Sequence, residues 1–315
     1  MTRPIISVFI PARNEAGNIT PLFDKIARAF QSLNVPGEII FVDDGSTDAT
    51  WNEATTATQR YPFARLFRHR KSLGLTEAMR TGFPKCRGDV VIFLPSDLES
   101  NPEEDIPALY AKINEGYDVV SGWRQGRNDG KVFASAIANI VAQKFFGLQV
   151  HDMNWIKAFR REVVENLRLR SDWHRYILIL AAAQGYTIGE VQVNYYPRKA
   201  GKSHYGIERL AISFLDVLVV WFLLTFSRKP MRFFGGIGMA MVGISLTTFA
   251  VLTVMYLTNL GQRRPIFDFA GILFIAGLLF FVVGFITELI VNQNDRVEEI
   301  ESRLRDLEEI DKETR

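Results

Sequence analysis

Cysteine is almost absent from this sequence, and its absence excludes two kinds of stabilising site. Cys86 is the single cysteine among 315 residues, so neither a disulfide framework nor a cysteine-based zinc site can form within the chain. We expect Cys86 to be a small buried side chain. A basic excess is lacking as well, because 37 Lys and Arg residues stand against 35 Asp and Glu residues. Without surplus cations to neutralise a phosphate backbone, the chain is not expected to bind nucleic acid.

Charged residues are missing from two long stretches near the C-terminus. Gly235–Leu257 contains no Asp, Glu, Lys, Arg, His or Pro over 23 residues, and Phe269–Thr287 is uncharged over 19 residues. A helix as long as the first stretch measures about 34 Å, which is enough to cross the hydrocarbon core of a bilayer. The alternative is a pair of buried core helices, but uncharged helices of this length are rare in soluble proteins. We therefore predict two transmembrane helices within residues 233–292, joined by a polar loop at Thr258–Asp268.

The preceding segment, residues 206–232, has the pattern of an amphipathic helix. Leu210–Phe226 is apolar except at Asp216, which shares one helical face with Glu208, Arg209 and Ser213. We predict a helix lying in the membrane interface, with a third span as the alternative. Two spans place three basic residues of 228–232 in the cytoplasm and two basic residues of the loop outside, as the positive-inside rule favours. The chain is thus expected to be an integral membrane protein of bacterial inner-membrane type, with a cytoplasmic N-terminal domain.

The C-terminal segment, residues 293–315, is rich in charge. Within Asp295–Arg315 there are nine acidic and five basic residues. Four apolar residues in it recur at coiled-coil spacing: Val297, Ile300, Leu304 and Leu307. Two heptads are only marginally stable alone. Two interpretations stay open, a solvated amphipathic helix or a self-association helix that would make the protein a homo-oligomer.

Residues 1–205 alternate short β-branched or aromatic runs with helical stretches, which predicts an α/β domain with a mostly parallel sheet. Ile5–Ile10 is expected to be a strand rather than a signal sequence, because it is short and charged residues soon follow. The other predicted strands are Glu38–Val42, Arg65–Arg68, Val90–Leu94, Tyr117–Ser121 and Val191–Tyr195. The predicted helices are Thr20–Leu33, Ala49–Tyr61, Leu75–Gly82, Ile106–Glu115 and Phe133–Phe146.

Polar clusters follow three of these strands where each strand ends. They are Pro11–Glu15, Asp43–Asp48 and Pro95–Glu99. Each alone could serve as a turn or helix cap, and Ser46 or Thr47 could cap the next helix. Ligands of open α/β sheets bind at the carboxyl edge of the strands. Three such clusters at successive strand ends therefore indicate a ligand site.

In the order and spacing of these motifs, the chain resembles glycosyltransferase family 2. More narrowly, it resembles the membrane-attached polyprenyl-phosphate glycosyltransferases, which include the dolichol-phosphate mannose synthases. The matching stretches are Ile10–Glu15, Val42–Asp48, Gly74 with Ala78 and Gly82, Asp97–Glu99, Asn154 with Lys157–Arg160, and Arg198–Ser203. The resemblance implies the GT-A nucleotide-sugar-binding fold for residues 1–205. A Gln-x-x-Arg-Trp motif, which marks the processive cellulose- and hyaluronan-synthase-like members, is absent.

The resemblance implies that a nucleotide sugar, carrying UDP or GDP, binds at the first two clusters. The implied donor contacts are Pro11, Arg13, Glu15, Asp43 and Asp44. Carboxylates suit ribose hydroxyls and base N–H groups because they only accept hydrogen bonds. Ser46 and Asp48 are expected to form turns or caps in addition.

In relatives, a divalent metal at an Asp-x-Asp-Leu-Gln motif neutralises the leaving diphosphate. Here Pro95 replaces the first aspartate and Glu99 replaces the glutamine. On an extended segment, Asp97 and Glu99 would point to the same side because side chains alternate. We expect these two carboxylates, with phosphate oxygens of the donor, to hold Mg²⁺ or Mn²⁺, which both prefer hard oxygen ligands.

A lipid phosphate acceptor needs cations rather than a general base, because it is already anionic near neutral pH, whereas a sugar hydroxyl would need a base. The expected ligands of the acceptor phosphate are Arg124, Arg127, His174 and Arg175. The resemblance adds Arg198 and Lys202 as catalytic residues together with Asp97. The alternative is a basic cytoplasmic surface attracted to anionic lipid.

The expected reaction is attack by a polyprenyl phosphate oxygen on the anomeric carbon of the nucleotide sugar, with inversion. Positioning and electrostatic stabilisation of the leaving diphosphate would supply most of the rate. Three alternatives stay open: a different lipid or sugar acceptor, a catalytically degenerate membrane scaffold, or a nucleotidyltransferase. Pro95 favours the scaffold. A nucleotidyltransferase ordinarily needs a Gly- and Lys-rich phosphate loop after the first strand, which Pro11–Glu15 is not.

Overall fold

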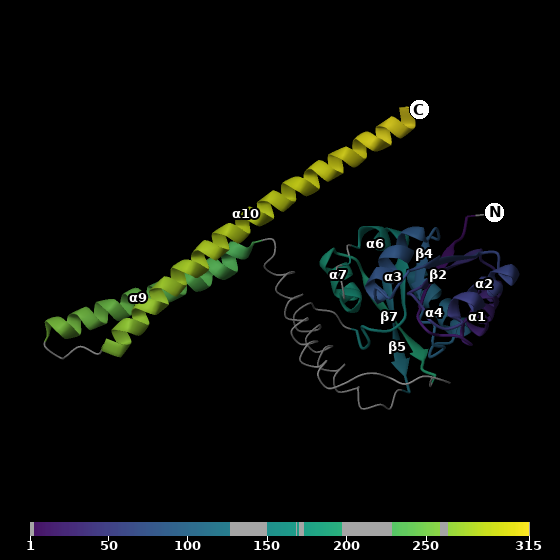
Figure 1. Ribbon diagram of the computed structural model, residues 1–315, viewed down its shortest axis with the longest axis horizontal. Helices are drawn as coiled ribbons and strands as arrows, with labels where there is room; N and C mark the ends of the chain where they lie inside the picture. Colours follow the sequence, from purple (N-terminus) through teal and green to yellow (C-terminus); the bar gives the residue numbers. More distant parts are fainter. Residues whose placement is uncertain are drawn as a thin grey trace. The chain divides into compact units, whose positions relative to one another are not determined.

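The computed structural model describes residues 3–126, 150–167, 169, 173–196, 229–258 and 264–314, with side chains to residue 300 except 294, 295, 298 and 299 (Figure 1). The chain divides into two compact units, Met1–Val217 and Leu218–Arg315. The predicted helix Phe133–Phe146 and almost all of the predicted interfacial helix lie outside the described residues.

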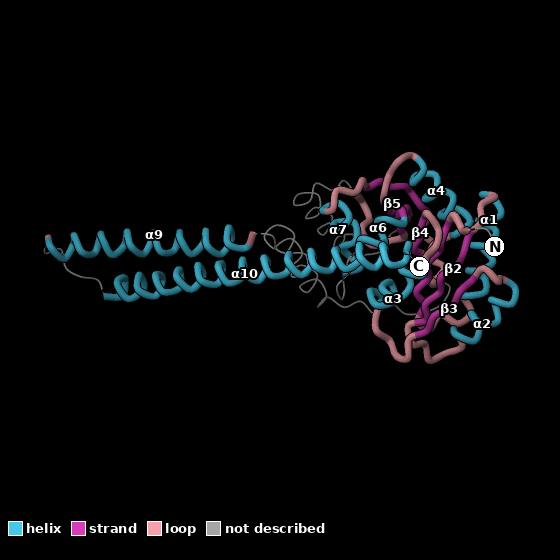
Figure 2. Tube along the Cα trace, turned by 90° about the horizontal axis from the view of Figure 1, so that it is seen from above, coloured by secondary structure: helices cyan, strands magenta, loops and turns pink. Residues whose placement is uncertain are grey.

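The first unit is built on a sheet of seven described strands in the order β3-β2-β1-β4-β6-β5-β7 (Figure 2). The strands are β1 (Ile6–Ala12), β2 (Gly37–Asp43), β3 (Ala64–Arg68), β4 (Val90–Phe93), β5 (Val119–Gln125), β6 (Lys157–Arg160) and β7 (Ile188–Asn194). β1 pairs in parallel with β2 and β4, with Ile6 opposite Gly37 and Val90. The predicted α/β class and mostly parallel sheet are confirmed.

The exception among the described strands is β6, which runs antiparallel to β4 and β5. β6 is not predicted from the sequence, because its four residues begin with Lys157 and end with Arg160 and so lack the apolar run of a buried strand. Its direction has a functional consequence. Lys157 begins β6 at the same edge of the sheet where β4 ends, opposite Phe93.

Helices cover both faces of the sheet (Figures 1 and 2). One face carries α1 (Ile19–Leu33), α2 (Thr50–Arg60) and α4 (Pro102–Asn114), whose buried side chains join alternate strand residues in one core. The other carries α3 (Leu75–Gly82), a 3₁₀ turn η1 (Phe83–Lys85) and α6 (Arg161–Asn166), with η2 (Trp173–Tyr176) and α7 (Ile177–Ala183) beyond. Gly82 lets α3 approach closely, because a Cβ there would lie 2.3 Å from the Phe9 ring.

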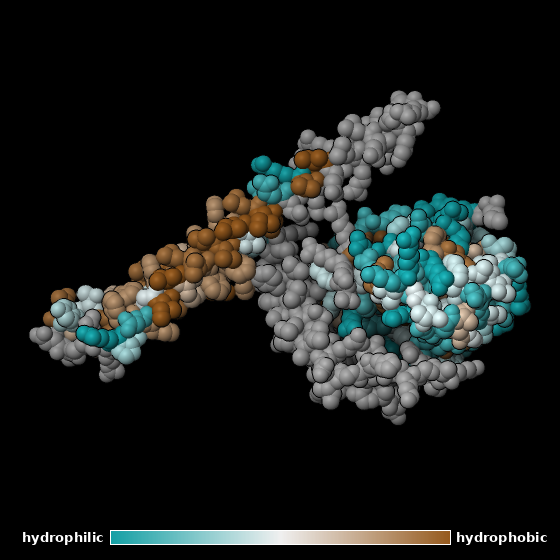
Figure 3. Space-filling view, in the orientation of Figure 1, coloured by the Kyte–Doolittle hydropathy of each residue, from teal (hydrophilic) through white to brown (hydrophobic). Residues whose placement is uncertain are grey.

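The second unit is a helical hairpin of α9 (Pro230–Leu257) and α10 (Arg264–Thr314). Two parts of it, Pro230–Leu257 and Arg264–Gln293, are long and apolar enough to cross a membrane. Hydrophobic residues gather over both helices (Figure 3). The predicted loop Thr258–Asp268 is wrong at its C-terminal end, because α10 already begins at Arg264, and a proline such as Pro265 is tolerated in a first helical turn. The predicted charged helix is simply the continuation of α10.

Small residues line the contact between these two helices at a spacing of seven. They are Gly238 and Ser245 on α9, and Ala270, Gly277 and Gly284 on α10. The larger Leu252 continues the same spacing on α9 and is buried as well. A Cβ at Gly238 would lie 2.6 Å from the Gly277 carbonyl oxygen, so the backbones approach as closely as glycine permits. Ser245 Oγ donates to the Ala270 carbonyl at 2.7 Å, and the Met231 N–H donates to Glu288 at 3.1 Å. Close backbones and satisfied polar groups are what helix association in lipid requires.

Candidate active site

The polar clusters predicted from the sequence meet at one edge of the sheet. β1, β2 and β4 are parallel neighbours, so their carboxyl ends lie together, and β5 and β7 point the same way. The antiparallel β6 brings the segment before Lys157 to this edge as well. Ser96 Oγ joins the first and third clusters directly by donating to the Pro11 carbonyl at 3.0 Å. This is the edge where open α/β sheets bind their ligands.

The loops after β1 and β2 are tied to each other by hydrogen bonds. The Asn14 N–H donates to Ser46 Oγ at 3.0 Å, and the Thr47 N–H donates back to Asn14 Oδ1 at 2.9 Å. Asp48 accepts hydrogen bonds from the Thr50 N–H at 3.0 Å and the Ala16 N–H at 3.2 Å. The turn roles expected of Ser46 and Asp48 are confirmed, but the expected cap is wrong, because α2 begins after Ala49 without a side-chain cap hydrogen bond.

Arg13 and Glu15 lie on the loop after β1, which these bonds tie to the loop after β2. Arg13 is exposed and its side chain has no partner among the described residues. The Glu15 N–H donates to Thr50 Oγ1 at 2.8 Å, and Glu15 Oε2 accepts from the Asn18 side chain at 2.8 Å. The two predicted donor contacts therefore sit on a loop whose backbone is fixed from the β2 side.

Asp43 ends β2 and is completely buried, yet one of its oxygens is left without a hydrogen bond in the described part of the chain. Asp43 Oδ1 accepts the Ser46 N–H at 3.0 Å. Arg68 Nε lies 2.9 Å from Oδ2, but not in the alignment of a hydrogen bond. A buried carboxylate oxygen with unused accepting capacity suits a ligand donor group.

A hollow of about 390 Å³ is lined by Gly45, Ser46, Arg68, His69 and Arg70. Two of these residues, Ser46 and Arg68, contact Asp43. Gly45 is required there twice over. Its φ of +68° is left-handed, and a Cβ would lie 2.5 Å from the Lys71 carbonyl carbon.

Asp44, predicted as a further donor contact, is occupied by the protein itself. Oδ1 lies 2.8 Å from His69 Nδ1 and accepts the Leu73 N–H at 2.8 Å. Oδ2 accepts the Ser72 hydroxyl at 2.7 Å and the Gly74 N–H at 2.9 Å. Burial alone would raise the pKa of Asp44, but these hydrogen bonds outweigh it and hold the pKa below its ordinary value. Asp44 thus fixes the loop that leads into α3.

The segment after β4 does not have the extended form that was predicted. Leu98 has a φ of +58°, and the Glu99 N–H folds back to Asp97 Oδ1 at 3.2 Å. Side-chain alternation therefore does not place the two carboxylates, which lie instead on a tight bend. A bulky residue in the left-handed region is strained by about 1–2 kcal/mol. In the described part of the chain, no group of three or more His, Cys, Asp or Glu side chains is arranged to hold a metal ion.

Arg124, predicted to bind acceptor phosphate, is already paired. Its Nε lies 2.6 Å from Asp152 Oδ2 and its Nη2 lies 3.2 Å from Oδ1, and each side chain is only 12% exposed. The guanidinium also packs 4.5 Å from the centre of the Trp155 ring. No pattern in the sequence singled out Asp152, because a lone aspartate ahead of an unrecognised strand carries no periodic signal.

Lys157 is a second buried cation at this edge. Its amine donates to the Trp155 carbonyl at 2.7 Å, and burial lowers the pKa of the ammonium to about 8. His174 and Arg175 lie on η2, which contacts the beginning of α3. His174 Nδ1 lies 2.9 Å from Thr76 Oγ1 in the first turn of that helix. Arg127, Arg198 and Lys202 lie outside the described residues.

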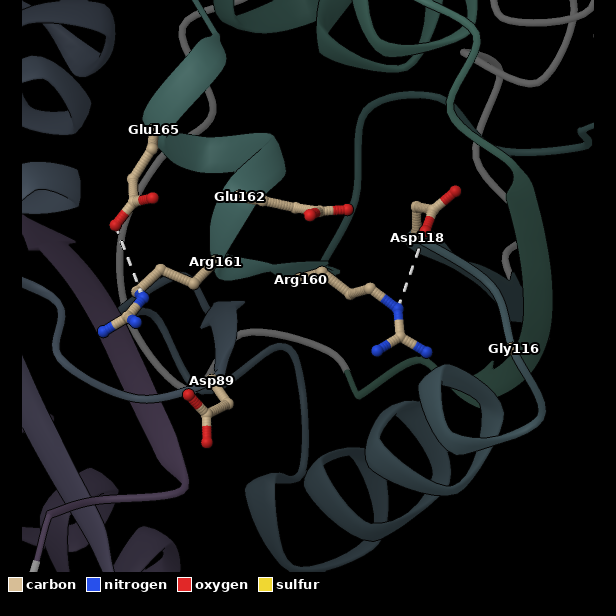
Figure 4. A pocket seen from close by; sticks show the side chains of 7 residues that line it. All are labelled: Asp89, Gly116, Asp118, Arg160, Arg161, Glu162 and Glu165. Atoms are coloured by element: carbon tan, nitrogen blue, oxygen red, sulfur yellow. Dashed lines mark ion pairs between the residues drawn. The ribbon is translucent and has the colours of Figure 1, made fainter. Parts of the chain in front are cut away.

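A second hollow, of about 480 Å³, opens at the opposite edge of the sheet, where β4 and β5 begin (Figure 4). Its lining is charged, but ion pairs occupy it, with Arg160 3.5 Å from Asp118 and Arg161 3.4 Å from Glu165. It contains none of the predicted site residues. The strand-end clusters therefore remain the candidate active site.

The chain is similar to known proteins along most of its length. The family model described as Glycosyl transferase family 2 matches residues 7–169. The dodecaprenyl-phosphate galacturonate synthase of Rhizobium johnstonii is 30% identical over 301 residues, covering 90% of this chain and 87% of that protein. The undecaprenyl-phosphate 4-deoxy-4-formamido-L-arabinose transferase of Edwardsiella ictaluri is 31% identical over 298 residues, covering 92% and 89%.

Among solved structures, the chain is similar to glucosyl-3-phosphoglycerate synthase from Mycobacterium tuberculosis in complex with Mn²⁺, UDP and phosphoglyceric acid. The TM-score is 0.56 at 22% identity, over 70% of this chain and 78% of that one. This likeness shows the fold, and the predicted GT-A-like α/β architecture is confirmed.

Proposed function

This chain belongs to glycosyl transferase family 2 and is a glycosyltransferase, and we propose that it moves a sugar from a nucleotide sugar to a polyprenyl phosphate. The observation that carries the proposal is the convergence of three polar strand-end clusters on one sheet edge, in a chain that also has two membrane-length helices. The relatives at 30–31% identity, named above for their polyprenyl-phosphate chemistry, support the same acceptor.

In this proposal the loops after β1 and β2 bind the nucleoside. Asp43, which pairs with Arg68 at the end of β2, would bind a base or ribose donor together with Pro11, Arg13 and Glu15 of the loop after β1. Asp44 acts indirectly, because its hydrogen bonds fix the backbone of residues 72–74. A pre-formed site of this kind spares the donor the free energy of ordering two loops.

The residues present fit a divalent metal, Mg²⁺ or Mn²⁺. Asp97 and Glu99 offer hard carboxylate oxygens on one bend, and Mg²⁺ ordinarily takes one or two carboxylates together with substrate phosphates. The metal would neutralise charge on the leaving diphosphate. The solved relative binds Mn²⁺ with UDP, which supports this choice.

The acceptor phosphate would bind a set of cations, called here the cationic rim: Arg127, His174, Arg175, Arg198 and Lys202. His174 and Arg175 are the described members, and Arg127, Arg198 and Lys202 are proposed from the sequence. Arg124 contributes in its paired state by shaping the rim with Asp152. An anionic phosphate oxygen then attacks the anomeric carbon in line, the bond to the diphosphate breaks, and the configuration inverts.

The membrane arrangement is part of the proposal. Residues 1–205 would form the cytoplasmic transferase domain, 206–232 an interfacial helix, 233–292 the two spans and 293–315 the charged helix. Such a chain keeps the active site near the headgroups, where a polyprenyl phosphate presents its charge. Homo-oligomer formation through the last segment is proposed only from its apolar spacing.

The test uses the full chain purified in detergent, with undecaprenyl phosphate and a panel of radiolabelled UDP- and GDP-sugars. We expect label from one donor to enter the lipid phase, and EDTA to abolish it. Transfer that resists EDTA would remove the metal from the proposal. Transfer to a different lipid or to a free sugar would overturn the acceptor, and nucleotide binding without transfer to any acceptor would favour the scaffold.

A further inference from the structure

A cluster of hydrogen bonds joins the end of β7 to the first turn of α4. Glu104 is its centre. Glu104 Oε2 accepts from the Asn194 side chain at 2.9 Å, and both carboxylate oxygens accept from the Tyr196 hydroxyl, at 2.9 and 3.1 Å. Glu104 Oε1 also accepts from the Asn101 side chain at 2.6 Å. Asn194 and Tyr196 therefore bind a carboxylate that lies 90 and 92 residues before them in the sequence.

The same cluster grips the segment that carries Asp97 and Glu99. The Tyr196 N–H donates to the Glu99 carbonyl at 3.0 Å. Asn101, which ends that segment, is held from three sides, by Glu104, by Lys25 Nζ at 2.7 Å and by Asp105 Oδ2, which accepts its N–H at 2.9 Å. Tyr196 thus binds the segment through its backbone N–H, while its hydroxyl donates to Glu104 of α4.

The bend in this segment needs restraint, which the hydrogen bonds of the Glu104 cluster supply. Leu98 occupies the left-handed region, and the strain of this backbone conformation would be relieved if the segment adopted another conformation. Such backbone strain persists only where the surroundings over-determine it. The core contact of Leu98 restrains the middle of the segment, and the Glu104 cluster restrains its C-terminal half.

The cluster lies at the surface, which separates its role from that of the core. Tyr196 is 37% exposed and Glu104 is exposed. Hydrogen bonds from Asn194 and Asn101 keep the pKa of Glu104 below its ordinary value, so its carboxylate is ionised around neutral pH. Exposed hydrogen bonds of this kind contribute little to global stability, because each of them replaces hydrogen bonds to water. Their removal should leave the fold intact.

We infer that Glu104 and Tyr196 are positioning residues, which hold the Asp97–Glu99 bend in the geometry that binds the donor diphosphate with its metal. The inference rests on the proposed function. It assigns a role to two side chains outside the strand-end clusters. Neither touches the reacting atoms, and both act through the Glu99 carbonyl and Asn101.

The test compares Tyr196→Phe and Glu104→Gln with Glu103→Gln in the full chain in detergent. Glu103 is the matched control, because it lies in the same helical turn and its carboxylate pairs with Arg28, at 2.8 Å, instead of with this cluster. For both cluster variants we expect the Mn²⁺ concentration for half-maximal transfer, and the donor KM, to rise roughly three- to tenfold. We expect the melting temperature to change no more than that of the control, and amide exchange at residues 96–101 to accelerate.

A fall in melting temperature with unchanged metal and donor half-saturation would mean a merely structural role and would overturn the inference. Cluster variants that match Glu103→Gln in every readout would also overturn it. If the wild type transfers no sugar to lipid phosphate, the proposed function has failed, and the inference is then judged by Mn²⁺ affinity, measured by electron paramagnetic resonance, and by amide exchange. If wild-type transfer resists EDTA, donor KM and amide exchange decide.

Discussion

Arg124 and Asp152 form a two-point ion pair, with Nε 2.6 Å from Oδ2 and Nη2 3.2 Å from Oδ1, at 12% exposure on each side. Its two partners come from different parts of the chain, the end of β5 and the segment before β6. The Ser121 hydroxyl adds a second link, because it donates to the Asp152 carbonyl at 2.6 Å. The pair therefore couples a predicted acceptor ligand to the backbone of the sheet edge.

Asp152→Asn should destabilise the protein more than removal of the whole pair. The variant leaves a largely buried guanidinium without its counter-charge, and breaking such a pair typically costs about 3–5 kcal/mol. Asp152→Ala combined with Arg124→Ala should cost less than the sum of the single changes, by at least about 1 kcal/mol. Chemical denaturation in detergent of the wild type, Asp152→Asn, the two single alanine variants and the double alanine variant measures both effects. Additive single changes would show that the pair is only a surface contact.

Asp44→Asn should lower activity through the loop and not through a lost donor contact. The amide can accept at only one of the two positions, so either the Leu73 N–H or the Gly74 N–H loses its partner, at about 1–3 kcal/mol. We expect kcat/KM to fall roughly 10- to 100-fold, with faster amide exchange at residues 72–74. Ser72→Ala removes one donor only and serves as the milder control. Lost activity with unchanged exchange would restore Asp44 as a direct donor ligand.

The sequence predicted the parts of the site that depend on strand ends. Pro11–Glu15, Asp43–Asp48 and Pro95–Glu99 each follow an apolar run, and parallel strands bring such ends together. It could not predict β6, whose four residues carry charge at both ends. The pairing of Lys157 with Phe93 across β6 and β4 was therefore not predicted either. Without β6, the sequence does not show that Asp152 lies beside Arg124. It therefore predicts Arg124 as a ligand of the acceptor phosphate and not as the partner of Asp152.

The bend at Leu98 and the role of Asp44 were hidden for a different reason. A left-handed leucine follows no local preference, and tertiary contacts impose it. The two aspartates of Asp43–Asp44 are adjacent and chemically identical, so only the backbone direction decides which one is filled by protein donors. In the second unit, length and missing charge were enough to predict the two membrane-length helices, but the beginning of α10 was not, because Arg264 and Pro265 suit a loop as well as a first turn.

Gly277→Ala should loosen the hairpin of α9 and α10. A Cβ at Gly277 would lie 2.9 Å from the Gly238 carbonyl oxygen and 3.0 Å from the Val242 nitrogen, and neither backbone can move without separating the helices. The expected loss is about 1–3 kcal/mol, as for overpacking elsewhere. Gly271→Ala is the matched control on the same helix, because nothing lies within 4 Å of its Cβ position. It should be neutral or stabilising, by up to about 1 kcal/mol, since alanine is the better helix former.

Thermal unfolding of the full chain in mild detergent measures both glycine variants. The prediction concerns the difference between them, so any effect that the detergent has on both proteins cancels. Equal melting temperatures for the two variants would contradict the close approach at Gly238 and Gly277. A deeper loss for Gly277→Leu would follow from the same geometry.

Asp105→Asn should change the pH dependence of stability in a defined direction. Burial raises the pKa of Asp105 to about 7, from an ordinary value of 3.8, although its oxygen accepts the Asn101 N–H. Between those values the folded chain holds a proton that the unfolded chain has lost. The folded state binds more protons, so its free energy of unfolding falls as pH rises from about 4 to about 7 and levels off above.

The asparagine variant retains a side-chain oxygen for the Asn101 N–H and has no charge to bury. Its advantage over the wild type should therefore be absent near pH 4, grow through pH 5 and 6, and reach on the order of 2 kcal/mol at pH 8, after allowance for solvent near the site. Denaturant unfolding of both proteins at each pH gives the difference directly, because titrations shared by the two chains cancel. A constant difference at every pH would mean that Asp105 is ionised in the folded protein throughout, and that its partner at the start of α4 stabilises the charge that burial disfavours.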